Sequence, residues 1–364
     1  MNFEKIINNK IFVIFIIPFF LGLLSVFSFQ PFNFTLINFL IFPVLFFILT
    51  YVNKRSKNIY RKKPFLKNLF FVGHSFGFGF FITSTYWISN SLTFDESLKF
   101  LIPFAIFLLP ILLGLFFGFC TLIIGPYLKS NLNSLTLFVV AFSLIDYLRG
   151  KMFTGFPWNL WAYSWSWFEE VLQVLNPIGL YAFNLLSISV FSLPAIFFFT
   201  RKKSHYAIFI ASLTIFFSNY IYGSFQINNN DKTNSLSVSN SSYQTVKIIS
   251  PNFELKYDPK SDEIIKNIDR LIKISSPEEE KKTIFIWPEG AFSGYNFQEI
   301  QSLKYNFSKN FSKNHLIILG INTNKKDTDN YFNSFIMVNN KFEILYKYNK
   351  RKLVPFGEFL PFEE

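Results

Sequence analysis

The polar stretch SFQINNNDKTNSLSVSNSSYQ, residues 224–244, separates two parts of the 364-residue chain that differ in sequence pattern. Asn and Ser dominate it, which is typical of a linker or a mobile loop. Long apolar runs precede it, whereas strand-like and helix-like segments alternate after it. The sequence therefore predicts a membrane domain at residues 1–223, a polar linker at 224–244 and an α/β domain at 245–364.

The first domain has the composition of a membrane protein, because 51% of the chain is hydrophobic and Phe alone occurs 53 times. Apolar runs long enough to cross a bilayer lie at about 11–29, 35–52, 67–91, 100–127, 133–149, 172–200 and 205–223. No small-residue cleavage site follows the first run, so it is interpreted as a membrane helix rather than a signal peptide. We therefore expect seven transmembrane helices.

The net charge of +12 arises mainly from short loops, so it indicates membrane orientation rather than nucleic-acid binding. Lys and Arg gather before the first run, between the second and third, and after the fourth and sixth. Loops with this bias are retained in the cytoplasm. The N-terminus is therefore expected inside the cell, and seven spans would place residue 224 onward outside the cytoplasm.

Residues 245–364 show the pattern of a layered α/β domain. Strands are predicted at 245–250, 283–287, 315–320, 331–338 and 342–348, and helices at 262–274 and 296–313.

One candidate for chemistry follows a strand directly. Glu289 comes after the strand at 283–287, where Pro288 fixes the backbone and Gly290 permits a sharp turn. Ligands of α/β folds gather at the carboxyl ends of such strands. A turn of this composition is more often structural than functional when it stands alone.

A second candidate segment, KRKLVPFGEFLPFEE at residues 350–364, follows the last predicted strand. It contributes Lys350 and a second carboxylate, Glu358. This loop alone is also an ordinary turn more often than a site. The two segments support each other because they lie in one domain. Glu289 is a candidate base, and Lys350 places an ammonium near the second carboxylate, Glu358.

The segments WPEGAF (287–292), YFNSFIMV (331–338) and YNKRKLVPFGEFLP (348–361) resemble the Glu and Lys segments of the nitrilase, or carbon–nitrogen hydrolase, superfamily. The membrane half resembles one branch of it, the apolipoprotein N-acyltransferases, in FSFQPFNF (27–34), FGFGFFITSTYWISNSL (76–92) and DYLRGKMFTGFPWNLWAYSW (146–165). The likeness covers nearly the whole chain. It implies a multi-span α-helical membrane domain followed by an extracytoplasmic, nitrilase-like α-β-β-α sandwich, here incomplete at its C-terminus.

The resemblance also implies a reaction. A fatty acyl chain would pass from a membrane phospholipid to the α-amino group of the diacylglyceryl-cysteine of apolipoproteins, through a thioester on a cysteine. By position, Glu289 would be the general base, Lys350 would stabilise the oxyanion, and Glu358 would be a second acid near the site. The implied location is the bacterial cytoplasmic (inner) membrane, with the catalytic domain on the periplasmic side. No cofactor and no nucleic-acid partner are implied.

Two aromatic residues are candidates for substrate binding. Trp158 lies in the segment FPWNLWAYSWSWF (156–168), on the same predicted side of the membrane as the catalytic domain. These aromatic side chains have two possible interpretations: they form an entry site for lipid beneath the active site, or they only anchor the protein at the membrane interface. The second stays open because Trp and Tyr favour membrane interfaces in general. Tyr257 stands where the family usually has Trp, while Ser250 and Pro251 stand where it has Gln and Gly.

The other ionisable residues within the apolar runs are interpreted structurally. Asp146 and Arg149 are three residues apart near the outer end of the fifth run, as in a structural ion pair. His74, His205 and His315 show no metal-ligand spacing, so no metal site is predicted.

Cys120 is the one cysteine of the chain and lies in LFFGFCTLIIG, residues 115–125. A thiol among apolar residues inside a span is hard to ionise, so Cys120 is interpreted as a packing residue and the chain as lacking the nucleophile. We therefore expect a truncated enzyme whose reading frame continues beyond Glu364 with a cysteine and a final apolar span. The 364 residues alone are expected to form no acyl-enzyme.

Three alternatives stay open. A membrane-tethered, nitrilase-type amide hydrolase would use Glu289 and Lys350 but leaves the multi-span half unexplained. A genuine stop codon after Glu364 would leave a non-catalytic remnant. A transporter with an extracytoplasmic domain is disfavoured, because transporters usually need ionisable groups deep in their spans.

Overall fold

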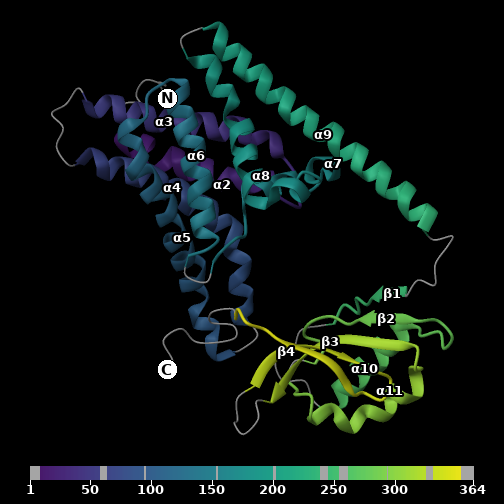
Figure 1. The fold of residues 1–364 in the computed structure, drawn as a ribbon. Coiled ribbons are helices and arrows are strands. Elements are labelled where there is room, and N and C mark those ends of the chain that lie inside the picture. The colour runs from purple at the N-terminus through teal and green to yellow at the C-terminus, as the bar shows by residue number, and fades with distance from the viewer. Residues whose placement is uncertain are drawn as a thin grey trace. The chain divides into compact units, whose positions relative to one another are not determined.

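The computed structural model describes residues 9–57, 64–93, 96–152, 155–199, 202–237, 245–253, 261–292, 294–324 and 331–353. The chain divides into two compact units, Met1–Thr233 and Asn234–Glu364. Figure 1 shows that helices make up the first unit, whereas the second contains a sheet. The prediction of apolar helices followed by an α/β domain is confirmed.

Among the described residues, six helices are long and apolar enough to cross a membrane: Thr35–Arg55, Phe65–Thr93, Glu96–Tyr127, Leu132–Arg149, Leu175–Phe198 and Lys203–Asn230. Their α-helical segments are α3 (Asn38–Lys57), α4 (Pro64–Thr85), α5 (Ile102–Ile124), α6 (Leu132–Arg149), α8 (Leu175–Ser192) and α9 (Lys203–Ser237). The first predicted run forms a shorter apolar helix, Phe12–Ser28, which includes α2 (Ile17–Ser25). A seventh span therefore stays a prediction.

The segment predicted as a linker begins as helix. α9 continues without a break through residues 224–237, and residues 238–244 lie outside the described part of the chain. The sequence 224–244 contains no Gly or Pro. Nothing in its backbone chemistry therefore stops a helix that the preceding apolar segment has already nucleated. The structure thus differs from the expected irregular linker over residues 224–237.

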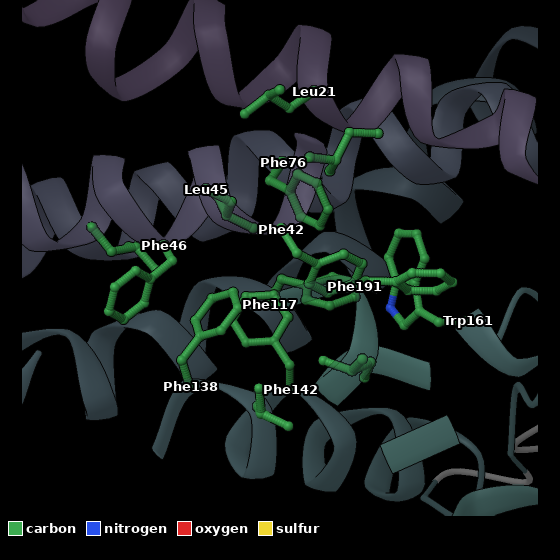
Figure 2. Close-up of a cluster of buried hydrophobic side chains, with 14 of the residues drawn as sticks. Leu21, Phe42, Leu45, Phe46, Phe76, Phe117, Phe138, Phe142, Trp161 and Phe191 are labelled. Atoms are coloured by element: carbon green, nitrogen blue, oxygen red, sulfur yellow. The ribbon is translucent and has the colours of Figure 1, made fainter. Parts of the chain in front are cut away.

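Aromatic rings fill the core of the membrane unit. The Trp161 ring lies 4.8 Å from the rings of both Phe42 on α3 and Phe80 on α4, and all three side chains are fully buried. Figure 2 shows this ring cluster, to which α3, α4, α5, α6 and α8 all contribute. Lipid tails are as apolar as these side chains, so dense van der Waals packing must hold the helices together.

Glycines allow α4 to approach its neighbours closely. A Cβ on Gly79 would overlap the carbonyl group of Phe19 in α2, and a Cβ on Gly22 would overlap that of Phe76 in α4. On the other side of α4, Gly73 meets the backbone of α5 in the same way. The three helices therefore touch backbone to backbone, with no room for a side chain between them.

The second unit contains one five-stranded sheet in the order β1 (Thr245–Ile248), β2 (Thr283–Ile286), β3 (His315–Asn324), β4 (Tyr331–Val338) and β5 (Ile344–Asn349). β2 pairs in parallel with β1 and with β3, whereas β4 pairs antiparallel with β3 and with β5. The helices α10 (Ser261–Ser275) and α11 (Lys304–Asn310) connect the parallel strands. All predicted strands and helices are present, although the helix expected at 296–313 is shorter and begins with a 3-10 turn, Glu299–Leu303.

The two faces of this sheet differ. Buried residues of α10 and α11 pack on one face against Phe285, Ile317 and Ile336, and Figure 1 shows both helices on that side. Side chains alternate along a strand, so their neighbours point to the opposite face, called here the open face. There Ile248 is 79% exposed and Phe335 is 44% exposed. Within the described residues the unit has one helical layer and one sheet, half of the sandwich implied by the resemblance.

Gly79→Ala is expected to destabilise the membrane unit by about 1–3 kcal/mol, the usual cost of overpacking, because its Cβ would meet the fixed backbone of α2. Gly118→Ala is the matched control, since its Cβ would meet the ring of Phe70, which can move aside. Unfolding in detergent, followed by tryptophan fluorescence, measures both. Equal stability of the two variants would contradict the backbone contact.

Candidate active site

Glu289 lies in a tight turn that directly follows β2. The N–H of Trp287 donates to the carbonyl of Ile318 at 2.9 Å, which extends the pairing of β2 with β3, and its indole N–H donates to Ser275 Oγ at 3.0 Å. Gly290 has a φ of 82°, a conformation that residues with a Cβ rarely adopt. The predicted sharp turn at Gly290 is confirmed.

The far end of the turn is also tied to β3. Phe297 donates its N–H to the carbonyl of Asn322 at 2.8 Å, while Phe292 is buried in the core. Gly320 lies on the open face of β3, and a Cβ there would come 3.7 Å from the Cα of Glu289. The turn therefore lays Glu289 along the open face of the sheet.

Lys350 directly follows β5 and continues its pairing with β4. Its N–H donates to the carbonyl of Asn333 at 2.8 Å. Asn349 pairs with Ser334, which is buried on the helix-covered face. Because side chains alternate, Lys350 belongs to the open face, the same face as Glu289.

The structure brings these two predicted residues together. Lys350 Nζ lies 3.9 Å from Glu289 Oε1, and the two side chains are 33% and 78% exposed, respectively. This separation is longer than a direct hydrogen bond, and exposed pairs of this kind contribute little to folding. The carboxylate is therefore accessible as a proton acceptor, and the ammonium lies where a developing oxyanion beside Glu289 would meet it.

Other predicted site residues are placed only in part. Glu358 and Tyr257 lie outside the described residues, so their roles stay predictions. Ser250 and Pro251 follow β1, with Ser250 exposed and Pro251 buried.

Trp158 belongs to the membrane unit, between α6 and α7 (Glu169–Leu172), and is 49% exposed. Its ring meets that of Phe156 edge to face at 5.0 Å. Arg149, at the end of α6, donates from Nη1 to the carbonyls of Phe156 and Trp158, both at 2.7 Å. The guanidinium therefore holds the backbone on both sides of Pro157.

Arg149 also forms the predicted ion pair with Asp146, which is confirmed: Nη2 lies 3.0 Å from Oδ1, and the side chains are 1% and 0% exposed. Asn184 of α8 donates to Asp146 Oδ2 at 2.9 Å and accepts the N–H of Ala162 at 3.1 Å. Sequence reasoning missed Asn184. The one feature of the sequence that points to Asn184 is its amide side chain inside an apolar run. An unpaired polar group is costly there, so a partner is expected.

Cys120 is buried in α5, within the apolar core of the membrane unit, as expected of a packing residue. Across the described ranges no three His, Cys, Asp or Glu side chains group so that they could hold a metal ion. The expectation that the protein uses no metal stays a prediction.

Comparison with known proteins adds sequence similarity to this geometry. Residues 21–193 match the family model for the apolipoprotein N-acyltransferase N-terminal domain. The apolipoprotein N-acyltransferase of Rickettsia prowazekii (strain Madrid E) is 30% identical over 348 residues, covering 94% of this chain and 65% of that protein. That of Brucella melitensis biotype 1 is 28% identical over 347 residues, covering 92% and 63%. The chain is therefore similar in sequence to the apolipoprotein N-acyltransferases over most of its length.

The region that matches the N-terminal domain of the apolipoprotein N-acyltransferases contains Trp158 and the whole network from Asp146 to Asn184. Coverage of 92–94% means that the similarity also includes most of the second unit. The chain spans less than two thirds of the length of these apolipoprotein N-acyltransferases.

Arg149→Met is expected to destabilise the membrane unit by about 3–5 kcal/mol, because it leaves Asp146 buried without its charge partner. The double variant Asp146→Asn/Arg149→Met removes both charges and should recover part of this loss. Equilibrium unfolding in detergent measures both proteins. A double variant no more stable than Arg149→Met would show that the uncompensated charge is not the cause.

Proposed function

We propose that this chain carries the membrane part and the base-bearing part of an acyltransferase. The enzyme moves a fatty acyl chain from a membrane phospholipid to the α-amino group of the diacylglyceryl-cysteine of apolipoproteins. Homology to the apolipoprotein N-acyltransferases supports this reaction class. The observation that carries the proposal is the Glu289–Lys350 pair, 3.9 Å apart on the open face of the sheet.

In this proposal two acyl transfers proceed through a thioester. First, a cysteine thiol gives its proton to Glu289, and its sulfur bonds to an ester carbonyl carbon of the phospholipid. The carbon–oxygen bond then breaks, the proton passes to the glycerol oxygen, and a lysophospholipid leaves. Second, the lipoprotein amine attacks the thioester. The carbon–nitrogen bond forms, the carbon–sulfur bond breaks, and Glu289 passes the amine proton to the thiolate.

Lys350 has the complementary role in both steps. Each transfer passes through a tetrahedral intermediate whose oxygen becomes negative, and one preorganised donor there stabilises the transition state by roughly 3–4 kcal/mol. Two thirds of the Lys350 side chain is shielded from water, which strengthens its attraction to an oxyanion. Glu358 is proposed as a second acid near this pair.

Cys120 is not the proposed nucleophile. Its thiol is enclosed in the core of the membrane unit, and reactive cysteines need an accessible site that favours the thiolate. We therefore expect the isolated 364 residues to form no acyl-enzyme. Cys120→Ser should leave any activity of the natural gene product unchanged.

Membranes that contain the natural gene product should transfer label from an acyl-labelled phospholipid to a diacylated lipopeptide. Glu289→Gln and Lys350→Ala are each expected to lower the transfer at least about 100-fold, because they remove the base and the oxyanion donor. Lys281→Ala is the control, since Lys281 pairs with a different carboxylate, Glu278, at 3.4 Å. Mass spectrometry detects the lipopeptide product and the acyl-enzyme.

Two outcomes of this assay would contradict the proposal. Normal acyl-enzyme in either active-site variant would mean that the residues are wrongly assigned. Release of ammonia from simple amides without acyl transfer would favour a membrane-tethered, nitrilase-type hydrolase instead.

Both proposed substrates carry acyl chains that anchor them in a membrane, which suits a multi-pass membrane protein. We place the chain in the bacterial inner membrane, with its second unit on the periplasmic side. Trp158, half exposed and fixed by Arg149, is proposed to contact the substrate lipids.

A cysteine introduced at Ser302, an exposed residue of the second unit, should react with a membrane-impermeant maleimide in intact spheroplasts. The buried Cys120 leaves little background. Lys129→Cys, in a loop predicted to be cytoplasmic, should react only after lysis. Labelling of Ser302→Cys only after lysis would reverse the proposed orientation.

A further inference from the structure

A row of buried polar side chains lies on the helix-covered face of the sheet, opposite Lys350. Thr323 of β3 is 3% exposed and Ser334 of β4 is 1% exposed. Their hydroxyl oxygens are 2.7 Å apart, and Ser334 Oγ donates to Asn349 Oδ1 at 2.9 Å. Asn349 is the residue that directly precedes Lys350, so the row ends at the base of the candidate catalytic lysine.

The hydroxyls of this row are linked by hydrogen bonds from β5 to β3 and β4. Lys347 of β5 can only donate, and its Nζ lies 3.1 Å from Thr323 Oγ1. The Thr323 and Ser334 hydroxyls share a hydrogen bond in which either can be the donor, and the acceptors within reach of Ser334 Oγ are Asn349 Oδ1 at 2.9 Å and the Phe332 carbonyl at 3.2 Å. A buried hydroxyl left unpaired is costly, so the bond to Asn349 is worth keeping.

Within the described residues, β5 buries few side chains that could fix its register. It is an edge strand of the described sheet, and five of its six residues are exposed. Its pairing with β4 is irregular at Met337 and Val338. A slip of one residue would turn Lys350 to the helix-covered face, away from Glu289. The bond between Ser334 and Asn349 can form in only one of these registers.

We propose that Ser334 is a positioning residue for Lys350. By binding Asn349 it fixes the register of β5, and so it keeps the Lys350 ammonium on the open face beside Glu289. Thr323 supports Ser334 from the next strand. The catalytic meaning of this device rests on the proposed function, whereas the placement of Lys350 can be measured without it.

The test measures the reactivity of the Lys350 amine in the full chain. Trace acetylation with acetic anhydride, read by peptide mass spectrometry, gives a rate for each lysine. Glu289→Gln should raise the Lys350 rate about threefold, because it removes a partly exposed carboxylate partner. In Ser334→Ala the Lys350 rate should already be raised, and adding Glu289→Gln should change it by less than about 1.5-fold.

Three variants separate positioning from folding. Thr323→Val should act like Ser334→Ala, whereas Thr323→Ser keeps the hydroxyl and should act like the unchanged chain. Thr283→Val removes a buried hydroxyl from β2 and should leave Lys350 unaffected. Lys281, paired with Glu278, is the internal reference in every sample. The inference is overturned if Glu289→Gln changes the Lys350 rate equally with and without the Ser334 hydroxyl, or changes it in neither.

In the natural gene product, Ser334→Ala should lower kcat for acyl transfer roughly 10- to 100-fold with KM nearly unchanged, as a misplaced catalytic group does. An unchanged kcat would overturn the role of Ser334 in catalysis. If the unaltered gene product transfers no acyl chain while the labelling behaves as expected, the proposed function fails and the positioning of Lys350 stands.

Discussion

The guanidinium of Arg149 is the charge around which the membrane unit is arranged. It is only 1% exposed, and a buried charge without partners costs several kcal/mol, so the fold must bring acceptors to it. Asp146 lies one helical turn away on α6. The carbonyls of Phe156 and Trp158 reach Arg149 only because the chain folds back after α6. Another path for this loop would remove both acceptors of Arg149 Nη1.

The same network sets the position of α8 and of the aromatic core. Asn184 links Asp146 to the N–H of Ala162, so α6, α8 and the returning loop are held by one set of buried polar groups. Trp161 directly precedes Ala162, and its ring packs 4.8 Å from those of Phe42 and Phe80. In a bundle where apolar packing has no preferred direction, these few directional bonds select one arrangement.

Local sequence chemistry was enough to predict the apolar runs, the strands and the turn at Glu289, because span length, alternation and turn residues are properties of short segments. The contact between Glu289 and Lys350 required the strand order, which the sequence alone does not give. The acceptors of Arg149 are backbone carbonyls without a sequence signature, and Asn184 lies 38 residues from its partner Asp146. The sequence did not predict the helix at the start of the expected linker. Its many Asn and Ser residues indicated a loop, although the segment contains no Gly or Pro to end a helix.

Two ion pairs of this chain show how burial decides what a charge can do. Arg149 and Asp146 are 3.0 Å apart and buried, so a change in either charge would leave the other uncompensated. Glu289 and Lys350 are 3.9 Å apart and partly exposed, so either side chain can turn toward another partner at little cost. An ion pair held this loosely does not fix the positions of its two side chains. On the open face of an edge strand its geometry has to come from elsewhere, and the buried hydroxyls of Thr323 and Ser334 supply it from the opposite face of the sheet.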